Sequence, residues 1–381
     1  MTNTFSTLLN AFRWLAALLV VLNHVRHLFL IDYKNVIDKN LLIKAFYFIT
    51  GLGHEAVIIF FVISGFLVGG LSLKKWPYKV SITDYFIARI SRIYIVLIPA
   101  LIIGSGLDWV GLNYFNNSEI YTNSAKYETS SLAFICSEQL NKLTFIGNIF
   151  NLQGILVPTL GSNGPLWSLA FEWWYYILFS CMGLLIYNKT LLINFFSITV
   201  IVSLIIFLPT KLTLWMIIWF LGIGVYFYGE SSWPKPSPFI ALVILSIVLF
   251  LSRTSHNTNN LIEPESLFTE FSRDFFLGTA FSIFLISLYK QTNKIPFDYL
   301  HLFFANFSYS IYLFHFPFLI FLSALLHDFY NIQFMQQPSN INIILVLSFC
   351  LSIYIYGYLM FLITEKHSIK LRSFITSIIT K

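Results

Sequence analysis

Long apolar stretches recur along the whole chain, and short polar or proline-containing breaks separate them. Runs of about 18 or more apolar residues predict helices that cross a membrane. Barrel strands do not fit this pattern, because they alternate in polarity and cover only about ten residues each. The predicted fold class is therefore all-α, a polytopic transmembrane helical bundle forming one integral membrane domain over residues 1–381. The ten predicted spans are 9–31, 45–72, 84–105, 165–187, 190–208, 212–228, 238–252, 272–289, 302–326 and 341–364.

One polar stretch, residues 106–164, is far longer than the other breaks. It is rich in Asn, Ser and Tyr and shows no helical period throughout, so we predict an outer loop. The first apolar run lacks a small-residue cleavage site, and no basic residue precedes Arg13. These features predict a retained first span rather than a signal peptide.

The distribution of charged residues mainly predicts how the bundle is oriented in the membrane. Only 10% of the residues are charged, too few to cover a water-facing surface. The net charge of +6 is not gathered in a basic block, so we predict no nucleic-acid partner. With both termini on the inner side, Lys and Arg are denser in the inner segments, as at Lys74, Lys75 and Lys290. This bias predicts cytoplasmic termini.

Metal and redox chemistry have little support in the sequence. Cys136, Cys181 and Cys350 lie far apart without a CxxC spacing, so neither a disulfide framework nor a zinc site is predicted. His54-Glu55 lacks the second His of an HExxH motif. We therefore predict no metal site and no bound cofactor.

Ionisable residues inside spans are expensive in lipid, so each is a candidate for function. Arg13 and His24 in the first span are eleven residues apart, which places them on one helix stripe about 16 Å apart. A neutral imidazole at His24 can take a proton from a hydroxyl. The structural alternatives are an interhelical hydrogen-bonded His24 and an Arg13 that anchors the helix at the interface beside Trp14.

Two arginines open the third span with a spacing of three, Arg89 and Arg92. That spacing puts both guanidiniums on one helix face, where they can hold a phosphate. Their alternative role is a positive-inside anchor. In the second span, Ser64 precedes Gly65 within a bulky apolar run. Small residues there favour close helix packing, and the alternative is a functional role for the Ser64 hydroxyl.

Two later segments bury further polar groups. Glu172 lies two turns into the fourth span, five residues after Trp167. A buried carboxylate needs a partner, so we expect His24 or an arginine beside it, for pairing or to orient a catalytic His. His315 is buried in an aromatic stretch of the ninth span, where helix packing is the alternative to a functional role.

Five segments together resemble the acyltransferase-3 family of multispan membrane acyltransferases. The chain matches the family's Arg, ten residues, His pattern at Arg13 and His24. The other matches are Phe-Phe-x-x-Ser-Gly-Phe at Phe60 to Phe66, Arg-x-x-Arg at Arg89 and Arg92, Trp-Ser-Leu-x-x-Glu at Trp167 to Glu172, and Ser-Tyr-x-x-Tyr-Leu-x-His at Ser308 to His315. The matches run in order across residues 8–364. Asn23 before the histidine and Asn10-Ala11-Phe12 before Arg13 depart from the family's usual residues.

The resemblance implies a stand-alone O-acyltransferase without an extracellular esterase-like domain, in a bacterial inner membrane. It implies acyl-CoA, expected to be acetyl-CoA, as the cytoplasmic co-substrate, and a cell-surface or lipid-linked carbohydrate as acceptor. Arg13, Arg89 and Arg92 would bind the donor, and His24 with Glu172 would carry the chemistry, either by deprotonating the hydroxyl or by relaying the acyl group. Ser64, Trp167 and His315 are further candidates. The alternatives are a transporter or flippase for lipid-linked sugars, and an acyltransferase acting on a lipid.

Overall fold

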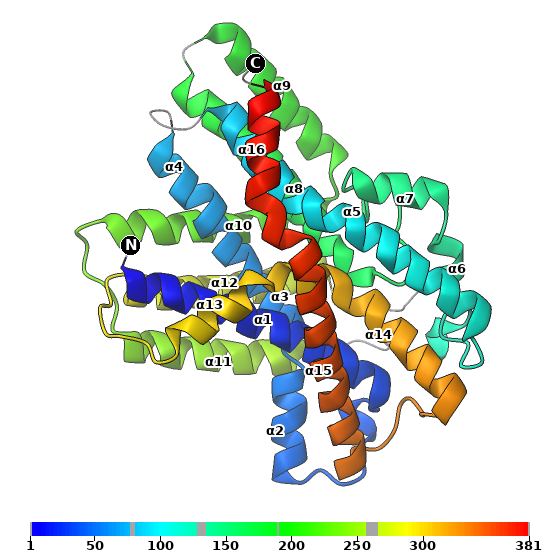
Figure 1. Ribbon diagram of the computed structural model, residues 1–381. Helices are drawn as coiled ribbons and strands as arrows, with labels where there is room; N and C mark the ends of the chain where they lie inside the picture. Colours follow the sequence, from blue (N-terminus) through cyan, green and yellow to red (C-terminus); the bar gives the residue numbers. More distant parts are fainter. Residues whose placement is uncertain (1, 77–80, 128–134, 189, 257–265, 380–381) are drawn as a thin grey trace. The chain divides into compact units, whose positions relative to one another are not determined.

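The computed structural model describes residues 2–76, 81–127, 135–188, 190–256 and 266–379. Throughout these residues the fold is built of helices, and they contain no β-strand (Figure 1). Nine helical stretches among them are long and apolar enough to cross a membrane, which confirms the predicted all-α polytopic class. They are Asn3–Phe29 (α1), Leu41–Lys74 (α2 to α4), Ile82–Tyr114 (α5), Gly164–Tyr187 (ending in α8), Thr210–Glu230 (α10), Pro238–Ser255 (most of α11), Leu267–Leu288 (α12), Ser308–Tyr330 (α14) and Asn340–Ile379 (α15 and α16).

Helix α5 shows how far a hydropathy pattern can misplace a boundary. The predicted third span ended at 105, but α5 continues without a break to Tyr114. Gly104, Ser105 and Gly106 lower the local hydropathy, yet three small or polar residues do not break a helix. The segment predicted as an outer loop therefore begins later, and it contains the helix α7 (Lys142–Ile149). Its residues 128–134 lie outside the described part of the chain.

Other bounds differ in informative ways. The predicted span 190–208 forms α9 (Leu191–Phe207), whose 17 residues cover about 26 Å, slightly less than a bilayer core of about 30 Å. The predicted span 302–326 is divided into α13 (Asp298–Asn306) and α14. A helix that the sequence did not predict, α16 (Ser368–Ile379), follows α15 (Asn340–Ile363).

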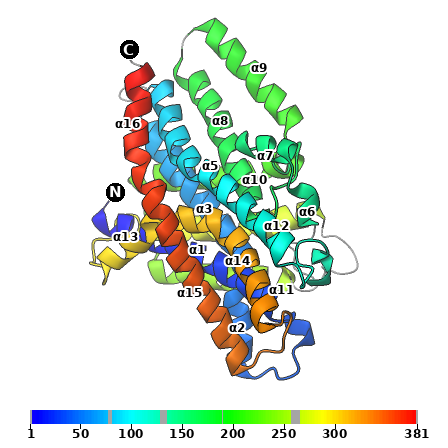
Figure 2. The same cartoon turned by 45° about the vertical axis from the view of Figure 1, so that its right-hand side comes forward.

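The chain folds as two compact units, each built from three separate stretches. Unit 1 comprises Met1–Ala16, His54–Tyr85 and Phe171–Phe303. Within it α10 packs against α12 and against the π-helical turn Gly65–Gly70, and α12 also packs against α11 (Pro238–His256) (Figure 1; Figure 2).

Two glycines bring the backbones of unit 1 into direct contact. A Cβ on Gly65 would lie 1.8 Å from the carbonyl oxygen of Trp219, and one on Gly222 would lie 2.0 Å from that of Val62. Close approach of this kind is how small residues promote helix association in membranes. The packing role expected beside Ser64 is therefore carried by its neighbour, Gly65.

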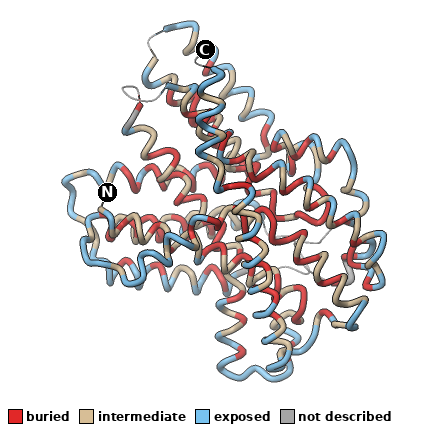
Figure 3. The backbone as a smooth tube through the Cα atoms, in the orientation of Figure 1, coloured by how far each residue is buried: buried red, intermediate tan, exposed pale blue. Residues whose placement is uncertain are grey.

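Unit 2 comprises Ala17–Gly53, Phe86–Ala170 and Phe304–Lys381. Helices α14 and α15 lie side by side within it (Figure 1; Figure 2). Its apolar core includes Val25, Phe29, Phe316 and Phe349, all nearly inaccessible. Burial along the helices follows single faces, and the opposite faces expose apolar side chains, as expected of lipid-facing helices (Figure 3).

The close approach at Gly222 predicts a stability defect with a matched control on the same helix. Gly222→Ala places a methyl group where the Val62 carbonyl lies, so we expect a loss of about 1–3 kcal/mol, typical of overpacking. Gly224→Ala meets no atom within 4 Å and should be tolerated. Thermal unfolding of both variants in detergent measures the difference. Equal melting temperatures would show that this backbone contact is not present.

Candidate active site

Helix α1 places the first motif on one continuous helix. Because α1 runs from Asn3 to Phe29 without a break, Arg13 and His24 share a stripe about 16 Å in length, as the spacing predicted. Both side chains are partly buried.

His24 lies against a second imidazole in unit 2. Its ring centroid is 5.3 Å from that of His315 on α14, and the Phe316 ring meets it edge-on at 4.9 Å. His315 is 1% exposed, whereas His24 is partly exposed. The structure therefore brings together two predicted candidates that the chain separates by almost three hundred residues.

The backbone fixes the tautomer of His315. Its Nδ1 lies 2.8 Å from the carbonyl oxygen of Tyr312 and 3.2 Å from that of Ile311, and a carbonyl can only accept, so Nδ1 carries the proton. Nε2 is then an acceptor, and this buried atom has no hydrogen-bond partner in the described residues. A buried imidazole nitrogen with a free lone pair, beside a partly exposed histidine, is suited to receive a proton.

The segment before α8 (Trp167–Tyr187) holds α14 in place around His315. The amide of Asn163 donates to the carbonyl of Leu313 at 3.0 Å, and the Tyr312 hydroxyl donates to the carbonyl of Pro165 at 3.1 Å. The Ser168 and Tyr312 hydroxyls are 2.5 Å apart. Trp167, beside Ser168, is partly exposed.

A buried carboxylate anchors the loop that supplies these hydrogen bonds to α14. Asp108 is 1% exposed and accepts from both the backbone N–H and the hydroxyl of Ser162, each at 2.7 Å. Gly161 has φ +54°, and its Cβ position lies 2.1 Å from Asp108 Oδ2, so a side chain there would collide with the carboxylate. The motif-based prediction did not find Asp108, because the predicted span ended three residues before it.

Glu172 lies in unit 1, and its hydrogen bonds differ from the expectation. Its Oε1 accepts from the Ser64 hydroxyl at 2.5 Å and from the Tyr176 hydroxyl. Within unit 1, hydroxyl donors and not an arginine satisfy this atom, and the expected pairing with His24 of unit 2 stays a prediction. Glu172 is only partly buried, and a carboxylate with two good donors needs no counter-charge at that depth.

Ser64 holds this carboxylate rather than offering a free nucleophile. Its oxygen accepts a hydrogen bond from the indole N–H of Trp219 at 3.1 Å, and its hydroxyl donates one to Glu172. Trp219 is fully buried, so the serine is fixed on both sides. Glu172 keeps Oε2 as a second acceptor, because within the described residues both of its hydrogen bonds fall on Oε1.

The arginine pair lies on α5, three residues apart on one helix face, as the spacing predicted. Arg89 is partly buried and Arg92 is exposed. Arg92 makes no hydrogen bond or ion pair with any described residue, so its guanidinium is open to an anionic ligand.

Comparison with known families identifies the chemistry. A family model described as an acyltransferase domain matches residues 7–357, which include all five motifs. The chain belongs to the acyltransferase-3 family. It is therefore a membrane acyltransferase. No curated protein and no solved structure matches the sequence of this acyltransferase.

The acyltransferase also contains a polar cluster that the motif-based prediction missed. His54 on α3 (Gly53–Ser64) lies 2.9 Å from both carboxylate oxygens of Asp274 on α12. The signal was present in the sequence, since Asp274 is a carboxylate within an apolar run. His54 was considered only as part of a metal motif.

The fixed tautomer of His315 predicts the effect of a conservative substitution. In His315→Asn the amide N–H can replace Nδ1–H toward Tyr312, but nothing replaces Nε2. We expect turnover to fall by about 10²-fold or more, because the Nε2 acceptor is lost. The melting temperature should change little, because the hydrogen bonds that hold α14 remain. Steady-state acyl transfer and thermal unfolding measure the two effects.

His327 on the same helix is the matched control. Its Nδ1 lies 2.8 Å from the carbonyl oxygen of Ile332, so His327→Asn makes the same exchange away from His24. Turnover in this variant should stay near that of the unmodified protein. Normal turnover in His315→Asn would assign His315 to helix packing.

Proposed function

We propose that this acyltransferase moves an acetyl group from cytoplasmic acetyl-CoA to a hydroxyl of a cell-surface or lipid-linked carbohydrate. The observation that carries the proposal is the pairing of His24 with His315, whose buried Nε2 is an unused acceptor. Acyl transfer to a hydroxyl requires a base, and neutral imidazole is the side chain best suited to that task near neutral pH. Neither the pairing nor the family match names the donor or the acceptor, so acetyl-CoA and the carbohydrate are both proposed.

The chemistry at His24 balances without an external acid or base. His24 takes the proton of the acceptor hydroxyl, and the oxygen attacks the thioester carbonyl carbon. The carbon–sulfur bond breaks, the acetyl ester forms, and the coenzyme A thiolate takes the proton from the imidazolium. If the acetyl group passed first to a His24 nitrogen, labelled acetyl-CoA would leave acetyl-imidazole on the protein before an acceptor is added.

Three arginines are proposed to bind the donor phosphates. Arg89 and Arg92 present two guanidiniums on one face of α5, and Arg92 is exposed with no protein partner in the described residues. Planar guanidiniums bind phosphate oxygens in pairs, which suits a coenzyme A diphosphate. Arg13 lies about 16 Å from His24 along α1, a distance comparable with the length of a pantetheine arm.

Unit 1 agrees with the predicted grouping of its inner segments, because residues predicted on one side meet at one end. Glu230 at the end of α10 pairs with Lys74 at 3.9 Å and accepts from the Tyr289 hydroxyl at 2.5 Å. The Thr2 hydroxyl donates to the carbonyl of Gln291 at 2.8 Å. All of these residues flank breaks that the basic bias assigns to the inside.

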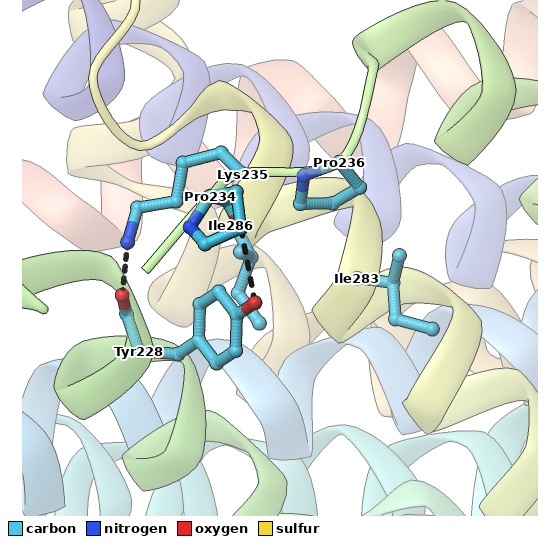
Figure 4. Close-up of a pocket in the computed structure, with 6 residues that line it drawn as sticks. All are labelled: Tyr228, Pro234, Lys235, Pro236, Ile283 and Ile286. Carbon is cyan, nitrogen blue, oxygen red and sulfur yellow. Dashed lines mark hydrogen bonds between the residues drawn. The ribbon is translucent and has the colours of Figure 1, made fainter. Parts of the chain in front are cut away.

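A pocket lies at this same end of unit 1, and its lysine, Lys235, binds the end of a helix. The Lys235 ammonium is turned toward the carbonyl of Tyr228 at the end of α10 (Figure 4). It also donates to the carbonyl of Ser231 at 3.1 Å, and a cation is favoured at this end of a helix. The pocket is lined by Tyr228, Pro234, Lys235, Pro236, Ile283 and Ile286. It contains no residue of the five motifs, so we assign it no part in acyl transfer.

Cysteine labelling tests the orientation. A cysteine at exposed Asn117 should react with an impermeant maleimide from outside, and one at Lys290 only from inside. The native thiols Cys136, Cys181 and Cys350 are buried, and burial also raises the pKa of Cys136, so they should stay unlabelled. Labelling with the opposite sidedness would reverse the proposal.

The function is tested with purified protein in nanodiscs, given acetyl-CoA and methyl glycosides of glucose, galactose and N-acetylglucosamine. Mass spectrometry should find an O-acetyl sugar. In His24→Ala the product should fall by about 10²-fold or more while acetyl-CoA binding is retained, because the imidazole acts on the proton and not on the phosphates. Acetylated lipid without acetylated sugar would identify a lipid acceptor. Intact acetyl-CoA with sugar crossing a vesicle membrane would identify a transporter.

The arginine pair predicts a defect confined to the donor. Arg92→Ala should raise the KM for acetyl-CoA about tenfold or more with little effect on the KM for the sugar, since one charge-assisted contact is lost. Arg372→Ala removes an exposed arginine of α16 outside the motifs and serves as the control. Equal donor KM values in the two variants would remove Arg92 from the donor site.

A further inference from the structure

A second polar cluster lies in unit 1 and is formed by residues outside the five motifs. At its centre Asp274 is fully buried, contacts His54 Nε2 at 2.9 Å and accepts the indole N–H of Trp215 at 2.9 Å. Arg273 Nε lies 3.7 Å from the same carboxylate. Such a network in a membrane bundle is expensive, so it is a candidate for function.

The cluster becomes more accessible toward one edge. Lys211 on α10 pairs with Glu270 on α12 at 2.6 Å, and its ammonium lies 5.2 Å from the centre of the Trp215 ring. The side chains of His54 and Glu270 are 22% and 21% exposed, and that of Lys211 is 40% exposed. We call His54, Lys211, Trp215, Glu270 and Asp274 the His54 cluster.

The His54 cluster lies at the end of unit 1 that the topology assigns to the outside. Lys211 and Glu270 begin α10 and α12, and Glu55 near the start of α3 accepts from Ser252 at the end of α11. The ends of α10, α11 and α12 flank breaks predicted outside, and α3 begins inside the predicted second span, nearer to its outer end. Glu230 ends α10 on the opposite side. If acetyl-CoA arrives from the cytoplasm, this end is the one open to the acceptor.

The chemistry of the cluster suits a hydroxylated ligand better than a metal ion. His54, Glu270 and Asp274 place possible ligand atoms within 4.8 Å of one another. However, the Lys211 ammonium already supplies a positive charge to Glu270, and the Trp215 N–H already donates to Asp274. A sugar hydroxyl both donates and accepts, so it can use the accessible carboxylate, imidazole and ammonium together.

The His54 cluster also has an aromatic ring beside it, which could contact the apolar face of a sugar. Phe271 is partly exposed on α12, one residue after Glu270, and packs edge-on against Trp215 at 5.4 Å. A sugar has an apolar face of C–H groups that an aromatic ring can cover, while its hydroxyls meet the charged edge.

We propose that the His54 cluster binds the hydroxyls of the carbohydrate acceptor on the outer side of the membrane. Glu270 accepts hydrogen bonds from the sugar, Lys211 donates to it, and His54 contacts it while Asp274 holds the imidazole in position. The inference rests on the proposed carbohydrate acetylation, and it adds an acceptor site formed by residues outside the five motifs.

The test measures acceptor and donor kinetics separately in nanodiscs. Glu270→Gln and His54→Gln should each raise the KM for the methyl glycosides about tenfold or more. The KM for acetyl-CoA, and its hydrolysis without acceptor, should stay unchanged. Both substitutions lie at the accessible edge, and thermal unfolding will confirm that the variants fold.

Glu230→Gln provides the matched control, because it makes the same carboxylate-to-amide change at the opposite end of unit 1. It should leave the glycoside KM unchanged. If the wild type acetylates the glycosides and all three variants share its glycoside KM, this inference fails and the proposed function stands. If the wild type acetylates no sugar, both fail. A requirement for added Zn²⁺ that Glu270→Gln abolishes would replace the sugar site with a metal site.

Discussion

A polar side chain inside a membrane bundle has no water to bond with, so each one must find its partners within the protein. This constraint explains the hydrogen-bonded sets around several buried carboxylates of the acyltransferase. Asp108 takes both of its hydrogen bonds from Ser162, and Glu365 likewise takes two from the N–H and hydroxyl of Ser310. In each case one carboxylate holds a loop or helix start against another segment of the same unit.

The same constraint applies at His315. Tyr312 beside it is satisfied, because its hydroxyl contacts both Pro165 and Ser168. Nε2 of His315 is one of several buried polar atoms without a partner among the described residues, and its ring lies against that of His24. An unsatisfied buried group costs about 1–3 kcal/mol, so a fold that keeps one beside His24 is spending stability where a proton is to be handled.

Sequence reasoning succeeded where the relation between residues was local. The stripe joining Arg13 to His24 and the face shared by Arg89 and Arg92 follow from helix periodicity alone. Pairing between distant segments could not be predicted in this way. Ser64 and Glu172 are 108 residues apart, and His54 and Asp274 are 220 apart. The sequence could indicate that each buried carboxylate needs a partner, but not that hydroxyls would be sufficient for Glu172.

The separation of the two ends of unit 1 has a consequence for the reaction itself. The acceptor hydroxyl loses a proton and the coenzyme A thiolate gains one, so the overall transfer consumes no proton from either side of the membrane. A donor from the inside and an acceptor from the outside would nevertheless meet at a point that neither bulk solvent supplies with protons. An imidazole is suited to hold the proton between the two half-steps, because a carboxylate, with its much lower pKa, is a weaker base and would take the proton from the hydroxyl less readily. The pair of partly exposed His24 and buried His315 meets this need, whereas Glu172 Oε1 and the Asp274 carboxylate already accept from fixed donors.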